Sequence, residues 1–199
     1  VLDAEPGSEL ICGLDPNAAP SDVRSAAETV SLERLLVRVP AKWGDSVIVP
    51  AGTVHAIGGG ILLAEIQQSS DLTYRLYDWG RLQADGTPRE LHLEKALAAI
   101  HLGSPPGGKT KPLSYANGPA QRTVLAACRH FAAELIELEG LPWTRHTGNE
   151  SFHILLSKTG SFTIHIFGHE HFVGSGRAVL IPGAVPEFLL EGKGSLLDY

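Results

Sequence analysis

The sequence predicts a mainly β protein made of two β-barrel or β-sandwich units with a few short helices. Most apolar residues occur in short runs, or alternate with polar residues, between glycines and prolines, which is typical of strands and tight turns. A step from glycine through five residues to proline occurs at 44–50 and again at 176–182. This repeat predicts two similar sheets.

A segment rich in glycine, proline and lysine, at 103–118, predicts a connection between the two sheets. We therefore expect a first unit over 1–102, a linker over 103–121 and a second unit over 122–199. The chain has 199 residues, of which 43% are hydrophobic, so it can bury the cores of one or two domains.

In the first unit, residues 10–12 predict a strand. Residues 21–28 and 31–38 predict two short helices, each beginning with a capping serine. Residues 47–49 predict a buried strand, after which the turn Pro50-Ala51-Gly52 reverses the chain and His55 begins the next strand.

Further along the first unit, residues 61–66 and 73–77 predict two more strands. The glycines at 58–60 match no phosphate-binding pattern and are expected to allow a tight turn. Thr87-Pro88-Arg89-Glu90 is a capping box with proline at the first helical position. The helix that it predicts has a buried stripe made of Leu93, Ala96, Leu97 and Ile100.

The second unit reads as strands alone, because apolar runs alternate with turn residues from residue 122 onward. The predicted strands are 124–128, 131–138, 152–156, 161–167, 178–181 and 188–190.

Charge and composition exclude several classes of function. The net charge of −6 and the lack of a basic run argue against binding to nucleic acid or to a membrane surface. No apolar run approaches the length of a membrane span, and no signal peptide opens the chain. Cys12 and Cys128 fit no metal-ligand pattern, so we expect free thiols and a cytoplasmic protein.

Polar side chains around His55 predict a pocket. Asp71 and Arg75 lie on the same face of the predicted strand 73–77, together with two hydroxyl side chains, because alternate strand residues share a face. Glu65 lies in the preceding apolar run. From spacing alone, the alternative is a lone core histidine with a surface Asp–Arg pair.

The pattern G-x5-P-x-G-x2-H, formed by Gly44, Pro50, Gly52 and His55, matches the second cupin motif. PAGTVHAI and the later run EIQQSSDLTYRLYDWGR resemble the signature of type I mannose-6-phosphate isomerases. The resemblance is dense over 44–101 and continues colinearly to residue 199. It implies a cupin-like (jelly-roll) fold. The repeated step predicts a second cupin-like unit, which we interpret as a degenerate copy without metal, since Glu187 stands where the first copy has His55.

The resemblance also implies an enzyme: a zinc-dependent aldose–ketose isomerase that interconverts mannose 6-phosphate and fructose 6-phosphate through an enediolate. It implies His55 as a zinc ligand, Arg75, Asp71 and Glu65 as catalytic residues, and Arg81 as a substrate-binding cation. In the family, zinc is also bound by a glutamine, another histidine and a glutamate, which match positions upstream of Val1. We therefore expect a fragment, with Zn²⁺ in the complete protein, a sugar phosphate as the partner and a monomer or weak homodimer.

Each of these residues has a structural alternative. Glu65 could form a buried pair with Arg75, Asp71 could cap a turn, and Arg81 could be an exposed loop cation. At the level of function, the alternatives are a non-catalytic sugar-phosphate-binding or regulatory cupin and a different cupin metalloenzyme such as an oxygenase.

A second histidine group lies in the second unit. His153, His165, His169 and His171 could converge on a metal ion if they shared one face of a sheet. Gly168 instead indicates a hairpin tip, at which exposed histidines would have no such role.

Overall fold

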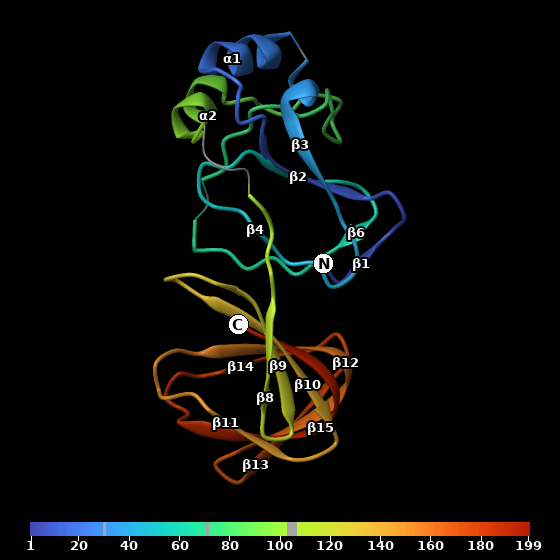
Figure 1. Cartoon of the computed structure of the whole chain (residues 1–199), viewed down its shortest axis with the longest axis vertical. Helices are drawn as coiled ribbons and strands as arrows, with labels where there is room; N and C mark the ends of the chain where they lie inside the picture. The colour runs from blue at the N-terminus through green and yellow to red at the C-terminus, as the bar shows by residue number, and fades with distance from the viewer. Residues whose placement is uncertain (30, 71, 103–106) are drawn as a thin grey trace. The chain divides into compact units, whose positions relative to one another are not determined.

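The computed structural model describes residues 1–29, 31–70, 72–102 and 107–199 (Figure 1). Strands account for 44% of the structure and helices for 10%, which confirms the mainly β class. The chain divides into two compact units, Val1–Lys109 and Thr110–Tyr199. We call them the N-terminal and the C-terminal unit. No helix within the described ranges is long and apolar enough to cross a membrane.

The central sheet of the N-terminal unit has three antiparallel strands in the order β3-β2-β5. Strand β2 (Glu9–Leu14) pairs with β3 (Leu36–Pro40) on one side and with β5 (His55–Ile57) on the other. His55 begins β5, as predicted, and lies opposite Cys12 of β2. The central strand therefore fixes where the backbone of His55 lies.

Two short ladders complete this unit. Strand β1 (Asp3–Ala4) pairs with β6 (Ile61–Leu62), and β4 (Val47–Ile48) pairs with β7 (Gly108–Lys109). The strand predicted at 47–49 is thus present, but it is only partly buried, since Ile48 and Val49 are exposed.

Helices α1 (Pro20–Glu28) and α2 (Leu93–Ala99) pack together and enclose a small apolar core with Leu14, Leu32 and Leu76. In α2, Ala96 is buried, and Leu93, Leu97 and Ile100 pack against this core. The predicted buried stripe is confirmed.

Several predicted elements of this unit are wrong. Residues 31–38 form only a short 3-10 turn, η1 (Leu32–Leu35), before β3 begins, because the chain pairs with β2 and its Val37 and Val39 favour an extended backbone. The helix predicted at 21–28 is present as α1 (Pro20–Glu28), but its predicted serine cap is wrong, since Asp22 accepts the N–H of Ala19 at 3.0 Å.

The predicted capping box also fails. Pro88 forms a β-bridge with Leu82, so the chain is extended there, and α2 begins only at Leu93. Of the predicted strand 61–66 only 61–62 pairs, and the described residues of 72–77 form no strand. A strand forms only where a neighbouring backbone offers a ladder, and β1 is just two residues long.

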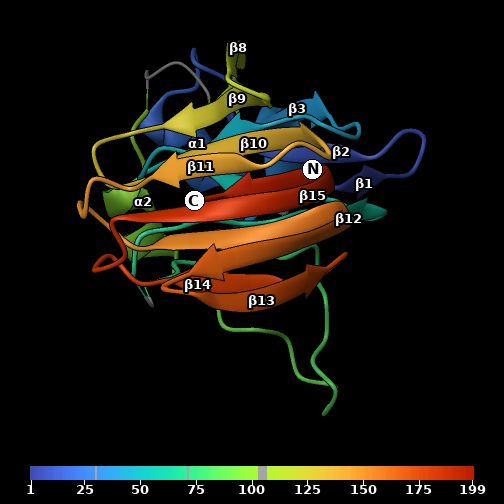
Figure 2. The ribbon, with the colours of Figure 1, turned by 90° about the horizontal axis from the view of Figure 1, so that it is seen from below.

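The C-terminal unit is one antiparallel sheet of eight strands. Its main path runs β13-β12-β15-β10-β9-β8, with β11 on β15 and β14 on β12. Figure 2 shows β10, β15 and β12 side by side. The bounds are β8 (Leu113–Asn117), β9 (Ala120–Ala127), β10 (Ala132–Glu139), β11 (Trp143–His146), β12 (His153–Ile166), β13 (His169–Gly174), β14 (Ala178–Ile181) and β15 (Glu187–Asp198).

This sheet extends further than the sequence predicted. The predicted strands 152–156 and 161–167 are one continuous strand, β12, because the register shift between Ser157 and Thr159 lets it cross the predicted break. Strands β11 and β13 were not predicted. The core includes Ile136, Leu155, Phe162, Ile164 and Leu196, all almost inaccessible to solvent.

Most of the predicted linker is structured. Residues 103–106 lie outside the described residues, but β7, β8 and the start of β9 occupy much of 108–121. The repeated step has a structural counterpart in each unit: Gly44 and Gly176 both have positive φ, and His55 and Glu187 each begin the strand that follows.

Candidate functional site

His55 is held by the turn that precedes it. Gly52, with φ of +81°, allows the N–H of Thr53 to donate to the carbonyl oxygen of Pro50 at 3.1 Å. The carbonyl oxygen of Thr53 is then 2.9 Å from Nδ1 of His55. In the tautomer in which Nδ1 donates to this oxygen, Nε2 carries the free lone pair. This is the usual arrangement of a metal-binding histidine.

The described residues offer this one donor but no complete metal site. No group of three or more His, Cys, Asp or Glu side chains is placed to hold an ion in the ranges that the structure describes. Cys12, opposite His55, is buried, and burial raises the pKa of its thiol. A protonated thiol is a poor ligand, so of these two paired residues His55 is the better donor for a metal ion.

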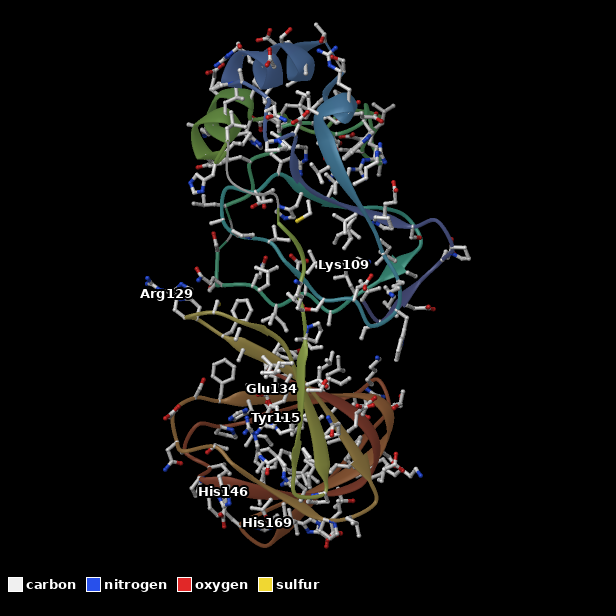
Figure 3. The ribbon with its side chains drawn as sticks, viewed as in Figure 1. Lys109, Tyr115, Arg129, Glu134, His146 and His169 are labelled. Atoms are coloured by element: carbon white, nitrogen blue, oxygen red, sulfur yellow. The ribbon has the colours of Figure 1, made fainter. Side chains whose placement is uncertain are left out.

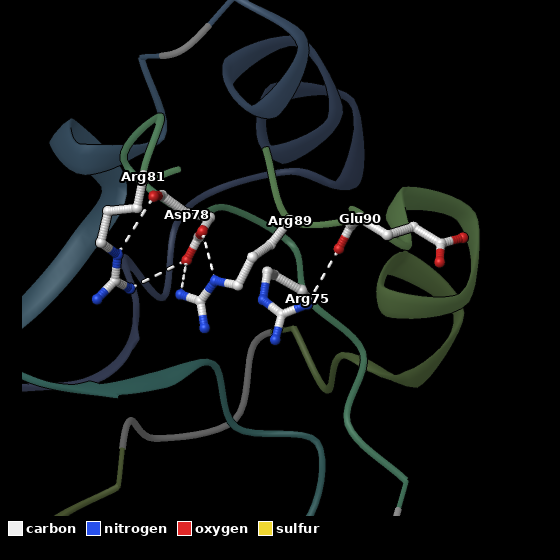
Figure 4. A network of polar contacts seen from close by, with 5 residues as sticks. All are labelled: Arg75, Asp78, Arg81, Arg89 and Glu90. Atoms are coloured by element: carbon white, nitrogen blue, oxygen red, sulfur yellow. Dashed lines mark hydrogen bonds and ion pairs between the residues drawn. The ribbon is translucent and has the colours of Figure 1, made fainter. Parts of the chain in front are cut away.

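A second group of polar residues surrounds the carboxylate of Asp78 (Figure 4). Arg89 donates from Nε to Oδ2 at 2.8 Å and from Nη2 to Oδ1. Arg81 donates from Nη2 to Oδ1 at 3.0 Å. The hydrogen bonds from Arg89, together with the charges of both arginines, lower the pKa of the Asp78 side chain.

The turn from Asp78 to Arg81 has an unusual backbone. Trp79 and Gly80 both have positive φ, +53° and +64°, and the N–H of Arg81 donates to the carbonyl oxygen of Asp78 at 3.0 Å. A tryptophan in this region costs about 1–2 kcal/mol. Aromatic and cationic contacts hold it: its ring lies 5.1 Å from that of Tyr77 and 5.2 Å from the Arg81 guanidinium.

Arg75 is attached to the segment that leads into α2. Its N–H donates to Nδ1 of His92 at 3.2 Å, its carbonyl oxygen accepts the N–H of His92, and its Nη1 donates to the carbonyl oxygen of Glu90 at 3.1 Å. The carboxylate of Glu90 points away from Arg75 in Figure 4. Among the described residues, no carboxylate lies within ion-pair distance of Arg75.

The structure describes two of the three other predicted site residues, Glu65 and Arg81. Asp71 lies outside the described residues. Glu65 is exposed, so it does not form the buried pair with Arg75 that was the structural alternative. Arg81 belongs to the Asp78 network and is not an isolated loop cation.

Sequence reasoning missed Arg89, which it assigned to a capping box. A turn through Asp85 and Gly86 and the bridge between Leu82 and Pro88 bring Arg89 back beside Asp78. The Asp-Gly pair is a signal of chain reversal that could have predicted this return.

The histidines of the C-terminal unit do not form a group. His153 binds Asp198, with Nδ1 2.8 Å from Oδ1, and His165 lies between Glu170 and Glu191. His171 pairs across the sheet with Ile164, the neighbour of His165, so the two histidines face opposite sides. Phe167 and Gly168 form the predicted hairpin tip, and His169 follows them. Figure 3 labels His169 and His146.

His171 lines a cavity of about 320 Å³ whose other lining residues are apolar. Glu187, which occupies the position equivalent to His55, pairs with His146 at 3.0 Å. Within the described residues of this unit, no group of three or more His, Cys, Asp or Glu side chains is placed to hold an ion.

No protein-family model matches the chain. Two curated relatives match 96% of it: the mannose-6-phosphate isomerase ManA of Bacillus subtilis, with 33% identity, and the mannose-6-phosphate isomerase of Streptococcus mutans, with 29%. The matched regions are 60% and 59% of those proteins, respectively. The chain thus spans about three-fifths of the length of these relatives.

Solved structures agree with this similarity. The crystal structure of the Bacillus subtilis mannose 6-phosphate isomerase superposes with a TM-score of 0.89 at 28% identity, covering the whole chain and 62% of that protein. Phosphomannose isomerase from Salmonella typhimurium has the same fold, with a TM-score of 0.68 at 13% identity. These matches confirm the cupin-like fold class and the resemblance found in the sequence. The chain is therefore similar to mannose-6-phosphate isomerases over about three-fifths of their length.

Proposed function

We propose that the protein containing this chain is an isomerase that interconverts mannose 6-phosphate and fructose 6-phosphate. The observation that carries this proposal is the pair of Arg81 and Arg89 on the ionised carboxylate of Asp78, in the same unit as His55 and Arg75. A local excess of positive charge in a chain of net charge −6 suits an anionic sugar. The similarity to mannose-6-phosphate isomerases supports mannose 6-phosphate as that sugar.

The reaction moves a proton between C1 and C2 of the sugar and develops negative charge on an enediolate oxygen. Arg75 has no carboxylate partner among the described residues, so its guanidinium can stabilise that charge. Arg81 is the cation that we assign to the phosphate group. Asp71 and Glu65 are the acids that we assign to proton transfer, and the exposure of Glu65 leaves its carboxylate accessible.

His55 is the residue of this chain that would hold zinc, through Nε2. When bound, Zn²⁺ supplies a Lewis acid that polarises a sugar oxygen. Hydrogen bonding of Nδ1 to the carbonyl of Thr53 keeps the imidazole in the orientation and tautomer for this role. We expect the remaining zinc ligands to lie outside the described residues.

A non-catalytic sugar-phosphate-binding or regulatory cupin is the second candidate. One observation favours it: no group of three or more His, Cys, Asp or Glu side chains is placed to hold an ion among the described residues, whereas Arg81 and Arg89 both lie at Asp78. In either case we propose a cytoplasmic protein that is a monomer or weak homodimer, with a small sugar phosphate as its partner.

The test is isomerase activity of the full-length protein. We expect turnover of mannose 6-phosphate, and near-complete loss of turnover in Arg75→Ala with an unchanged circular dichroism spectrum. Arg24→Ala is the matched control, because Arg24 forms an exposed ion pair with Glu94 on the helices. Full activity in a folded Arg75→Ala protein would overturn the proposed role of Arg75. If the wild-type protein binds the sugar phosphate but does not turn it over, the non-catalytic or regulatory cupin is the correct function.

Zinc content gives a separate test. Elemental analysis of the purified 199-residue chain should find close to no zinc, since no group of three or more His, Cys, Asp or Glu side chains is placed to hold an ion among its described residues. A value close to one zinc per chain would show that other residues of this chain complete the site. In the full-length protein, His55→Ala should lower the zinc content.

A further inference from the structure

Two arginines share the carboxylate of Asp78, but they bind it unequally. Arg89 forms a fork, with Nε on Oδ2 and Nη2 on Oδ1. Arg81 reaches only Oδ1 with its side chain, through Nη2, and its Nε makes a long contact of 3.4 Å with the carbonyl oxygen of Asp78. Arg89 is therefore the main partner of Asp78, and Arg81 is the secondary one.

The exposure of the three side chains agrees with this division. The Asp78 side chain is 7% exposed, Arg89 is 35% exposed, and Arg81 is 59% exposed. One negative charge faces two positive charges, so a charge of about +1 remains. It lies mainly on Arg81, the more exposed guanidinium, which keeps N–H groups free to donate to an anion.

We propose that Arg89 is a positioning residue that neutralises Asp78 and thereby leaves the charge of Arg81 available to an anionic substrate. The inference rests on the proposed function, in which Arg81 binds the phosphate of the sugar. Without Arg89, Asp78 would be free to form the same bidentate fork with Arg81. The Arg81–Asp78 pair would then be neutral and would bind an anion weakly.

The local fold supports such a role because it holds Arg89 in place. The N–H of Gln83 donates to the carbonyl oxygen of Thr87 at 2.7 Å, and Asp85 accepts the N–H of Thr87 at 2.9 Å. These bonds close the turn between Leu82 and Pro88. Arg89 therefore approaches Asp78 from a hairpin, whereas Arg81 approaches it from the other side, through its own turn (Figure 4).

The experiment compares variants of the full-length isomerase. In Arg89→Ala, we expect the KM for mannose 6-phosphate to rise roughly tenfold, about the effect of one charge-assisted hydrogen bond, while kcat changes little. In Arg89→Lys, which keeps the charge but loses the fork, KM should stay close to that of the wild type. Arg38→Ala is the control, because Arg38 forms exposed ion pairs with Glu9 and Glu33.

A rescue variant separates this role from a merely structural one. If Arg89 acts by neutralising Asp78, then Asp78→Asn combined with Arg89→Ala should return KM most of the way to the wild-type value, because Arg81 keeps its charge. If Arg89 only stabilises the loop, the double variant should bind no better than Arg89→Ala. That second result overturns the inference, as does an unchanged KM in Arg89→Ala.

Binding of inorganic phosphate to the 199-residue chain tests the inference without catalysis. Trp79 stacks on Arg81, so the NMR signal of its indole N–H should report phosphate binding. We expect Arg81→Ala and Arg89→Ala to weaken phosphate binding and the double variant Asp78→Asn/Arg89→Ala to restore it. If Arg81→Ala binds phosphate normally, both the role of Arg81 and this inference are wrong.

The two proposals can fail separately. If the wild-type full-length protein has no isomerase activity but the phosphate series behaves as expected, the proposed function is wrong and the role of Arg89 stands. If Arg81→Ala raises KM and Arg89→Ala does not, the proposed function stands and the role of Arg89 is overturned. Where Arg89→Ala does not fold, Arg89→Gln replaces it, because glutamine retains the polar stem without the charge.

Discussion

The Arg89 guanidinium donates to both carboxylate oxygens of Asp78, with Nε 2.8 Å from Oδ2, although 11 residues separate the two in the chain. The pair connects the turn at 78–81 to the hairpin that follows it. It also gives Asp78 a lowered pKa, because hydrogen bonds from Arg89 favour the ionised carboxylate in the folded protein. This has a consequence for the stability of the N-terminal unit.

We predict that ionisation of Asp78 makes the free energy of unfolding of the N-terminal unit depend on pH in the acidic range. Its folded-state pKa is lower than its unfolded-state pKa of about 3.9. Its contribution is therefore fully present above about pH 4 and is lost as the pH falls through the lowered folded-state value. In urea unfolding at several pH values, wild type should be more stable than Asp78→Asn near pH 6, and the difference should shrink below pH 4. A difference that is constant from pH 6 to pH 3 would contradict this prediction.

Gly58 allows strand β5 to lie close to β2. A Cβ added to Gly58 would lie 2.2 Å from the carbonyl oxygen of Glu9, whereas one added to Gly59 meets no atom within 4 Å. Gly58→Ala should therefore destabilise the unit by about 1–3 kcal/mol, since backbone atoms must move. Gly59→Ala is the matched control and should change the free energy of unfolding far less. Equal effects of the two substitutions in urea unfolding would argue against the close approach.

The core of the C-terminal unit depends on Leu196, which is fully buried on β15. Leu196→Ala should reduce the free energy of unfolding by about 2–5 kcal/mol because it leaves a cavity. Leu141, which is 63% exposed, provides the control, and Leu141→Ala should stay within about 0.5 kcal/mol of the wild type. Thermal unfolding of both variants measures the difference, and similar losses would show that the core is placed incorrectly.

Asp198 is the centre of a buried charged group in the same unit. Its side chain is 2% exposed, with Nδ1 of His153 at 2.8 Å and Nη2 of Arg145 at 3.3 Å. Asp198→Ala should cost about 3–5 kcal/mol, because it leaves the charge of the mostly buried Arg145 unpaired. Removing Glu139, which forms an exposed pair with Lys193, should have little effect. Comparable losses in chemical unfolding would mean that the Asp198 group is open to water.

Much of the local structure could be predicted from the sequence. Apolar spacing alone identified the buried stripe of α2, which contains Leu93 and Ala96, and the turn Pro50-Ala51-Gly52 placed His55 at the start of a strand. The motif around His55 also indicated the family. These features depend on neighbours within a few residues, where backbone sterics and side-chain periodicity act directly.

The prediction of longer-range features was less successful. Residues 31–38 had a helical pattern, yet residues from 36 onward form a strand because they pair with β2. His165 and His171 are close in sequence but lie on opposite faces of the sheet. The roles predicted for His55, Arg75, Arg81, Glu65 and Asp71 remain proposals.

The sequence by itself determined the mainly β class, the position of the motif and the residue types available for chemistry. Only the tertiary structure decided which charges meet, and Arg89 with Asp78 is the main case. The physical reason is that an ion pair or a strand ladder needs a partner brought in from elsewhere in the chain. Local propensity cannot specify that partner, because it is selected by the packing of the whole unit.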